Sequence, residues 1–186
     1  MSGQYKNQVR IIGGQWKRRS LRFPQIEGLR PTPDRVRETL FNWLGQDCTG
    51  LVCLDLFAGS GALGFEAASR NAAKVVSVET AKPVLEALRG NKAALDARNL
   101  EVVWSDGLRF LESTPERFDL VFLDPPFASD FLAKALERLP RILNEGALVY
   151  AECAAWPALD GWSLEKEGKA GQVHYGLLRR ATNGAQ

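Results

Sequence analysis

Residues 54–67 read LDLFAGSGALGFEA, an apolar strand that leads into a glycine-rich turn and then into a helix. Gly59, Gly61 and Gly64 have the spacing G-x-G-x-x-G, and Glu79 ends the next apolar run. Glycine permits a tight turn and close ligand approach, and a carboxylate at the second strand end can accept hydrogen bonds from a ribose. The stretch therefore predicts a Rossmann-like fold that binds a nucleoside-containing cofactor.

The alternation of strands and helices continues along the chain. Two alternating runs about GKAG, within residues 162–180, predict an antiparallel hairpin at the C-terminal end. We expect an α/β fold with a doubly wound, mostly parallel sheet of seven strands, whose ligands bind at the carboxyl ends of the strands. The predicted strands are 51–57, 74–79, 101–106, 118–124 and 147–153, and the predicted helices are 61–70, 83–98, 107–113 and 129–143.

The N-terminal region, residues 1–45, differs in charge from the rest. It holds nine Lys/Arg and three Asp/Glu, a balance of +6 within an overall charge of +2. It ends in a predicted helix that follows Pro31 and Pro33. We expect this small basic extension to be an arm that docks a polyanion such as RNA, beside a ligand-binding body formed by 46–186, the two making effectively one domain. The alternative is a solvated charged face.

The composition is that of an ordinary globular protein. Of the 186 residues, 45% are apolar and 25% charged, and no apolar run is long enough for a membrane span or a signal peptide. The cysteines Cys48, Cys53 and Cys153 are odd in number and widely separated, which favours neither disulfides nor a zinc site. We therefore expect a cytoplasmic protein without a metal.

Two further acids favour S-adenosylmethionine over a dinucleotide. A carboxylate at Asp55 would repel a pyrophosphate but suits an ammonium and a sulfonium, and Asp106 could accept a hydrogen bond from an adenine amine. Asp106 could equally be only the N-cap of a helix. Glu66 is expected to be a solvated helix residue. The predicted cofactor-binding residues are Asp55, Phe57, Gly59, Gly61, Glu79, Asp106 and Gly107.

The motif DPPF, residues 124–127, ends the fourth predicted strand, where two prolines cannot continue a sheet ladder. An exocyclic purine amine is a poor nucleophile because its lone pair is delocalised into the ring. The Asp124 carboxylate and the Pro125 carbonyl could grip its two N–H bonds, and Phe127 offers a face for a flipped base. We therefore predict that Asp124, Pro125 and Phe127 are catalytic. The alternative is a structural strand stop.

Several motifs together resemble one family. LDLFAGSGALGFEA, DPPF, GLRPTPDRVRETLFNWL, RIIGGQWKRRSL and GQVHYGLLRR are similar, in order, to RsmD-type 16S rRNA (guanine-966-N2)-methyltransferases. The resemblance implies a class I methyltransferase domain at 46–186, S-adenosyl-L-methionine as cofactor, and 16S rRNA as partner, within the small ribosomal subunit. It also implies that Arg30 and Thr32 close over the cofactor. We expect a monomer.

The arm would bind RNA by neutralising phosphates. The predicted nucleic-acid-binding residues are Arg10, Trp16, Lys17, Arg18 and Arg19, with Trp16 either stacking on a base or simply packed. His174, the sole histidine, is expected to be a surface or structural residue.

Other functions remain open from the residues alone. Cys153 ends the fifth predicted strand, where it could be the nucleophile of a pyrimidine-C5 methyltransferase, although Glu152 would raise its pKa. An adenine-N6 methyltransferase is chemically closer to the function predicted from DPPF, because its target is also an exocyclic purine amine. A dinucleotide oxidoreductase and a non-catalytic RNA-binding assembly factor are the two remaining alternatives.

Overall fold

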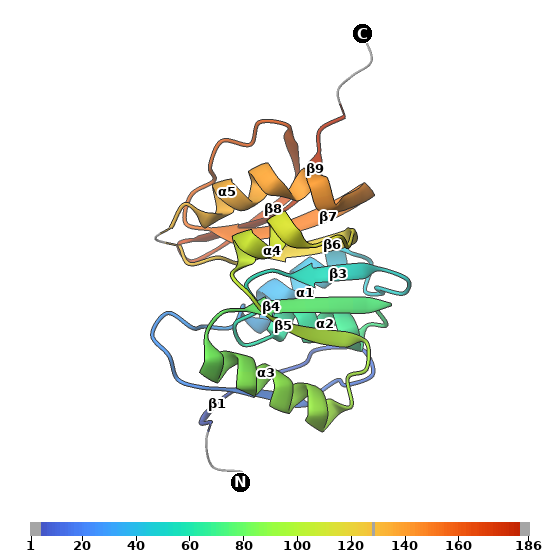
Figure 1. The fold of residues 1–186 in the computed structure, drawn as a ribbon, viewed down its shortest axis with the longest axis vertical. Coiled ribbons are helices and arrows are strands. Elements are labelled where there is room, and N and C mark those ends of the chain that lie inside the picture. Colours follow the sequence, from blue (N-terminus) through green and yellow to red (C-terminus); the bar gives the residue numbers. More distant parts are fainter. Residues whose placement is uncertain (1–4, 128, 183–186) are drawn as a thin grey trace.

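The computed structural model describes residues 5–127 and 129–182, and its centre is a seven-stranded sheet of order β5-β4-β3-β6-β7-β9-β8 (Figure 1). Strands β3 to β7 pair in parallel, whereas β9 is antiparallel to both β7 and β8. The predicted mostly parallel sheet with its C-terminal hairpin is confirmed. The strands are β3 Val52–Asp55, β4 Lys74–Glu79, β5 Leu100–Trp104, β6 Phe118–Leu123, β7 Leu143–Cys153, β8 Trp162–Ala170 and β9 Val173–Arg180.

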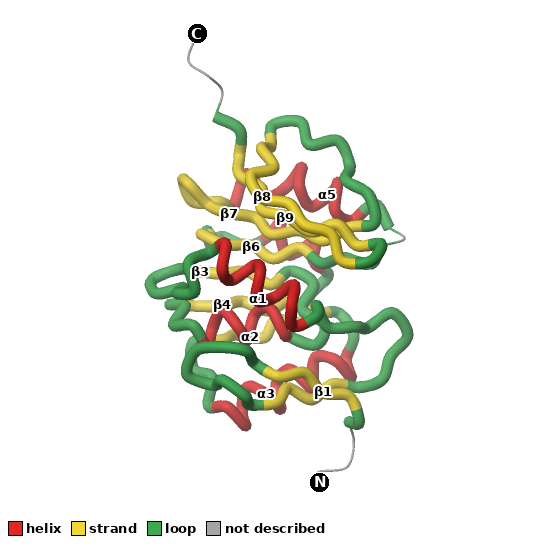
Figure 2. Tube along the Cα trace, turned by 180° about the vertical axis from the view of Figure 1, so that it is seen from behind, coloured by secondary structure: helices red, strands yellow, loops and turns green. Residues whose placement is uncertain are grey.

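Helices cover both faces of this sheet. Successive side chains of a strand point to opposite faces, so Cys53 joins one apolar core and Leu54 the other. The helices α4 and α5 lie over the face seen in Figure 1, and α1 and α2 over the face seen in Figure 2. The helices are α1 Asp34–Trp43, α2 Ala62–Ser69, α3 Lys82–Leu95, α4 Gly107–Ser113 and α5 Phe131–Arg138. Within the described ranges, no helix is both long enough and apolar enough to cross a bilayer.

The helix predicted at 129–143 is shorter than expected. The helix α5 ends at Arg138, the 3₁₀ helix η1 follows at Leu139–Ile142, and β7 begins at Leu143. Pro140 explains the break, because it has no N–H to donate to an α-helical hydrogen bond.

The N-terminal arm contains a hairpin that the sequence pattern does not reveal. Strand β1 Asn7–Arg10 pairs antiparallel with β2 Ser20–Phe23, outside the main sheet. The hairpin lies beside α3 (Figure 2), where the Asn91 side chain bonds both the N–H and the C=O of Arg22, at 3.1 and 2.9 Å. Each of its strands has only four residues, and so short an alternation of buried and exposed residues is a weak predictor of a strand.

The arm and the body share one apolar core. Val9, Ile11 and Leu21 of the arm lie in the same buried cluster as Phe65 of α2 and Val84 of α3. This sharing favours the expectation of effectively one domain. Residues 1–4, 128 and 183–186, which belong to the predicted regions 1–45 and 46–186, lie outside the described residues.

Candidate active site

The glycine loop between β3 and α2 is held by Glu79. Gly59 and Gly61 have φ angles of +52° and +83°, in the left-handed region that favours glycine. The Gly59 N–H donates to Glu79 Oε2 at 2.9 Å, and the N–H groups of Thr80 and Ala81 donate to Oε1 at 3.1 Å each. A carboxylate has about four lone-pair sites, so Glu79 can still accept from a ribose hydroxyl while it fixes the loop.

Asp55 is a buried acid beneath the same loop. Its side chain is 1% exposed and its Oδ2 accepts a hydrogen bond from the Gly64 N–H at 3.1 Å. Burial, opposed by the Gly64 hydrogen bond and supported by the charges of Glu79 and Glu152, raises the pKa of Asp55 to about 7. No ion pair among the described residues includes Asp55. A ligand that brings a cation would supply the missing partner, and S-adenosylmethionine fits this requirement.

At the end of β5, Asp106 is exposed and its Oδ1 accepts from the Arg109 N–H at 3.0 Å. The N-cap interpretation is therefore confirmed, while its contact with adenine stays a prediction. A Cβ at Gly107 would lie 3.1 Å from Phe57 and 3.2 Å from the Leu56 carbonyl oxygen, so this position is packed closely against the glycine loop. These contacts place the predicted cofactor residues around one loop.

The DPPF motif follows β6, the neighbour of β3, as expected. Asp124 is half-buried, Pro125 is buried and Phe127 is 50% exposed. No hydrogen bond between described residues uses the Pro125 carbonyl. Burial, then the charge and hydrogen bond of Glu152, then Asp55, raise the pKa of Asp124 well above its usual range. The motif thus presents two acceptor oxygens and an accessible ring beside the glycine loop.

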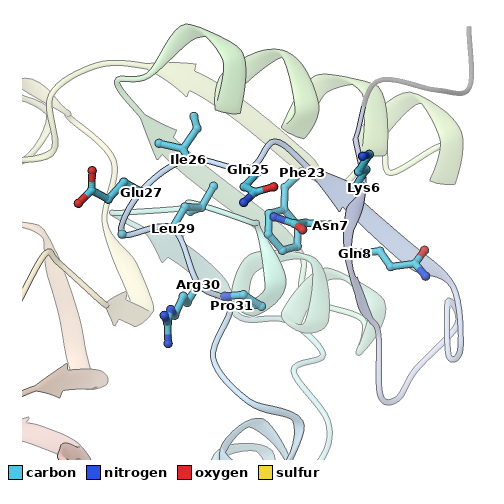
Figure 3. Close-up of a pocket in the computed structure, with 11 residues that line it drawn as sticks. Lys6, Asn7, Gln8, Phe23, Gln25, Ile26, Glu27, Leu29, Arg30 and Pro31 are labelled. Carbon is cyan, nitrogen blue, oxygen red and sulfur yellow. The ribbon is translucent and has the colours of Figure 1, made fainter.

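The segment 24–33, between β2 and α1, crosses over the glycine loop. The Leu29 side chain lies 3.0 Å from where a Cβ on Gly59 would be. A cavity of about 960 Å³ lies between this segment and β1, and Figure 3 shows Phe23 between the two sides. Arg30 lines the cavity, whereas Thr32 is buried and its hydroxyl donates to Glu152 Oε2 at 3.2 Å. Closure of Arg30 and Thr32 over the cofactor stays a prediction.

The prediction that Glu66 is a solvated helix residue is wrong. Its side chain is fully buried and pairs with Arg37 at 3.2 Å and with Arg70 at 3.0 Å. It also accepts hydrogen bonds from the N–H groups of Ile12 and Gly13, at 3.0 and 2.8 Å. The error arises because the arm covers this face of α2. Arg37, counted among the arm's cations, is consequently buried and already paired.

The structure also contradicts the stacking prediction for Trp16 and favours packing. Trp16 is 8% exposed and belongs to the apolar core. Its backbone N–H donates to the Ser69 hydroxyl at 3.0 Å, and that hydroxyl donates to the Gly13 carbonyl at 2.6 Å. A buried ring cannot stack on a base unless the arm rearranges. The four cations predicted with it, Arg10, Lys17, Arg18 and Arg19, are all exposed.

Cys153 lacks the environment of a nucleophile. Burial, followed by the charges of Glu167 and Glu152, raises the pKa of this thiol to about 11. A nucleophilic cysteine needs a lowered pKa, so the pyrimidine-C5 alternative is disfavoured. His174 is half-buried on β9, with its Nδ1 3.6 Å from Glu167, which is compatible with a structural role. The described residues contain no group of His, Cys, Asp and Glu arranged to hold a metal ion.

Glu152 is the residue of this site that the sequence interpretation missed, since it entered only as a neighbour of Cys153. It is the second-last residue of β7 and lies beside Asp124, and both the Tyr150 and Thr32 hydroxyls donate to it. A signal was available, because Glu152 follows an apolar strand just as Asp55 and Asp124 do.

Comparisons with known proteins identify the family. A family model described as "Conserved hypothetical protein 95" matches residues 9–179. Ribosomal RNA small subunit methyltransferase D of Escherichia coli strain K12 is 45% identical, over 95% of this chain and 92% of the relative. The Haemophilus influenzae protein of the same name is 44% identical, over 94% and 95%. The chain belongs to the RsmD family of methyltransferases.

The RsmD assignment agrees with the fold. A solved Escherichia coli structure, named as the methyltransferase yhhF, superposes with a TM-score of 0.84 at 46% identity, covering 94% of this chain and 98% of that one. The described sheet and its helices are those of a class I methyltransferase, and the chain is an enzyme of that class.

Proposed function

We propose that this protein transfers a methyl group from S-adenosylmethionine to the exocyclic N2 amine of a guanine, position 966, in 16S rRNA. The observation that carries the proposal is the Asp124 carboxyl group and the Pro125 carbonyl at the end of β6, next to the glycine loop. The 45% identity to a small subunit rRNA methyltransferase supports the substrate class. We place the enzyme in the cytoplasm, as a monomer acting on the small ribosomal subunit.

The cofactor, when bound, supplies an electrophilic methyl group on a sulfonium. Asp55 would face its cationic part, Glu79 would accept from a ribose hydroxyl, and Asp106 would accept from the adenine amine. Phe57, Gly59, Gly61 and Gly107 would shape the loop that it approaches.

The residues at DPPF would activate the guanine amine by orientation. An N–H bond donated to the Asp124 carboxylate and another to the Pro125 carbonyl favour a pyramidal nitrogen whose lone pair points out of the ring plane. The exposed Phe127 ring can stack on the flipped base. Positioning of this kind can lower the activation barrier by on the order of 7–11 kcal/mol when the reacting atoms are held close to the geometry of attack.

The raised pKa of Asp55 gives a test of the cofactor site. The α-ammonium of S-adenosylhomocysteine would lower the pKa of Asp55 from its free value of about 7, so binding releases a proton at and below neutral pH. Affinity should therefore rise about tenfold between pH 6 and pH 8. Calorimetry in two buffers of different ionisation enthalpy counts the released protons. The Asp55→Asn variant should lose the pH dependence. A pH-independent affinity without proton release would remove Asp55 from the cation site.

The basic loop, residues 13–19, gives a test of rRNA docking. Lys17, Arg18 and Arg19 are exposed, while Glu66 and Ser69 hold the loop's backbone on α2. Replacing all three cations with glutamine should weaken rRNA binding. It should also make the negative slope of log affinity against log salt shallower by about 2 to 3. Filter binding at several salt concentrations measures both quantities.

A matched control replaces three exposed cations of the C-terminal hairpin, Lys166, Lys169 and Arg180, with glutamine. This control changes the net charge equally and should leave the salt slope unchanged. An unchanged slope in the basic-loop variant would mean that another surface docks the rRNA.

The function itself is tested with labelled S-adenosylmethionine. The protein is incubated with small ribosomal subunits, naked 16S rRNA or DNA, and the labelled nucleoside is identified after digestion. N2-methylguanosine from a ribosomal substrate is the expected product. Methyladenosine or methyluridine would overturn the substrate, and no label in any sample would favour the non-catalytic assembly factor.

A further inference from the structure

Glu152 and Asp124 lie side by side at the ends of adjacent strands. Strands β6 and β7 are parallel with Leu123 opposite Ala151, so the next residue of each strand reaches the same edge. Glu152 is 5% exposed, and its carboxyl group is near enough to raise the pKa of Asp124. Two acids, one buried and one half-buried, therefore lie at the same edge of the sheet, next to the proposed acceptor position.

The groups that bind Glu152 directly are uncharged. The Tyr150 hydroxyl donates to Glu152 Oε1 at 2.8 Å, and the Thr32 hydroxyl donates to Oε2 at 3.2 Å. Both donor side chains are buried. Neither Glu152 nor Asp124 takes part in any ion pair between described residues.

The described groups known to lie near the pair include no unpaired cation. Asp55 faces Asp124 from β3, and Tyr175 on β9 is opposite Glu152. Arg37 of α1 comes near through Thr32, whose carbonyl accepts from Arg37 Nε at 3.0 Å, but its guanidinium is paired elsewhere. The titratable groups around the pair are thus acids and phenols, with one arginine already neutralised.

Two neighbouring carboxylates with little access to water do not both ionise, because their repulsion and desolvation favour one proton held between them. We propose that Glu152 is a positioning residue that shares one proton with Asp124, fixes this carboxyl group, and leaves its second oxygen free for the target amine. The proposal rests on the proposed function.

The proton balance of the reaction is consistent with such a pair. Methyl transfer forms a C–N bond and breaks a C–S bond, which leaves a positive charge on the guanine nitrogen. One N–H proton then passes to the pair, whose charge changes from −1 to zero, and the pair later returns it to solvent. The free Asp124 oxygen is the atom that receives it.

The test compares the wild type with Glu152→Gln in single-turnover methylation across pH. In the wild type, the rate should fall at low pH as the pair takes up its second proton. In Glu152→Gln the Asp124 carboxyl group must ionise alone, with only an amide donor in place of the shared proton, so the low-pH limb should move up by about one unit or more. The affinity for S-adenosylhomocysteine should not change. Glu145→Gln, at an exposed position of the same strand, is the matched control.

A second measurement does not depend on activity. Carboxyl ¹³C NMR should show Asp124 titrating well above its usual range in the wild type and at lower pH in Glu152→Gln. An unmoved pH limb together with an unchanged Asp124 titration would overturn the proposal. If the wild type methylates no RNA, the proposed function fails, while the NMR titration still decides whether the two acids share a proton.

Discussion

Replacing Asp124 with alanine should lower the rate of methyl transfer by about 10²–10⁴-fold, the range typical for loss of a positioned proton acceptor. The affinity for S-adenosylhomocysteine should stay nearly the same, because Asp124 is assigned to the amine and not to the cofactor. Single-turnover methylation of small ribosomal subunits measures the first quantity and calorimetry the second. Activity equal to the wild type would exclude Asp124 from the mechanism, and a parallel loss of cofactor affinity would move it to the cofactor site.

The Asp124→Asn variant separates chemistry from folding. Because the pKa of Asp124 is raised in the folded protein, the native state binds more protons than the unfolded chain above the ordinary carboxyl pKa of 3.8. Wild-type stability therefore falls as the pH rises above that value. The asparagine variant should avoid this loss, so it should melt higher than the wild type at pH 8 but not at pH 4, while remaining inactive. Thermal unfolding at the two pH values checks the sign.

Replacing Glu66 with alanine should destabilise the protein by about 3–5 kcal/mol, because two buried arginines lose their shared partner. For a chain of this size, that corresponds to a fall in Tm of roughly 6–20 °C. The loss should also free the basic loop, since the Ile12 and Gly13 N–H groups donate to the same carboxylate. Thermal unfolding gives the stability, and limited proteolysis within residues 13–19 reports the loop.

Glu165→Ala is the matched control for this experiment. Glu165 also pairs with an arginine, Arg179 at 2.8 Å, but both side chains are 38% exposed. An exposed pair contributes about 0–1 kcal/mol at most. Equal destabilisation by the two variants would show that burial of the Glu66 cluster does not matter.

The sequence predicts the sheet and the glycine loop because these depend on local patterns. A continuous apolar strand ending in LDLFAGSG requires left-handed residues at Gly59 and Gly61, whatever the rest of the chain does. The DPPF motif likewise predicts its own place, since two prolines stop a strand at its end. Pro140 is also a local signal, since a proline breaks an α-helix. The prediction of one helix at 129–143 followed the pattern of apolar residues and did not use this signal.

The roles of Glu66, Trp16 and Glu152 depend on distant contacts. Glu66 looks solvated on its own helix and becomes buried because the arm, more than fifty residues earlier, covers it. Trp16 is buried for the same reason, although it lies in a loop rich in cations. Such contacts join residues far apart in sequence, so no local period or spacing encodes them.

The sequence by itself determined the fold class, the glycine loop and the acids at the strand ends, because strand period, glycine geometry and proline chemistry act within a few residues. Tertiary structure alone decided which charges are free and which are used. It paired Arg37 with Glu66, left Lys17, Arg18 and Arg19 exposed, and set Glu152 against Asp124. The reason is that burial and charge pairing are properties of surfaces brought together by folding, and both determine which groups can ionise or bind.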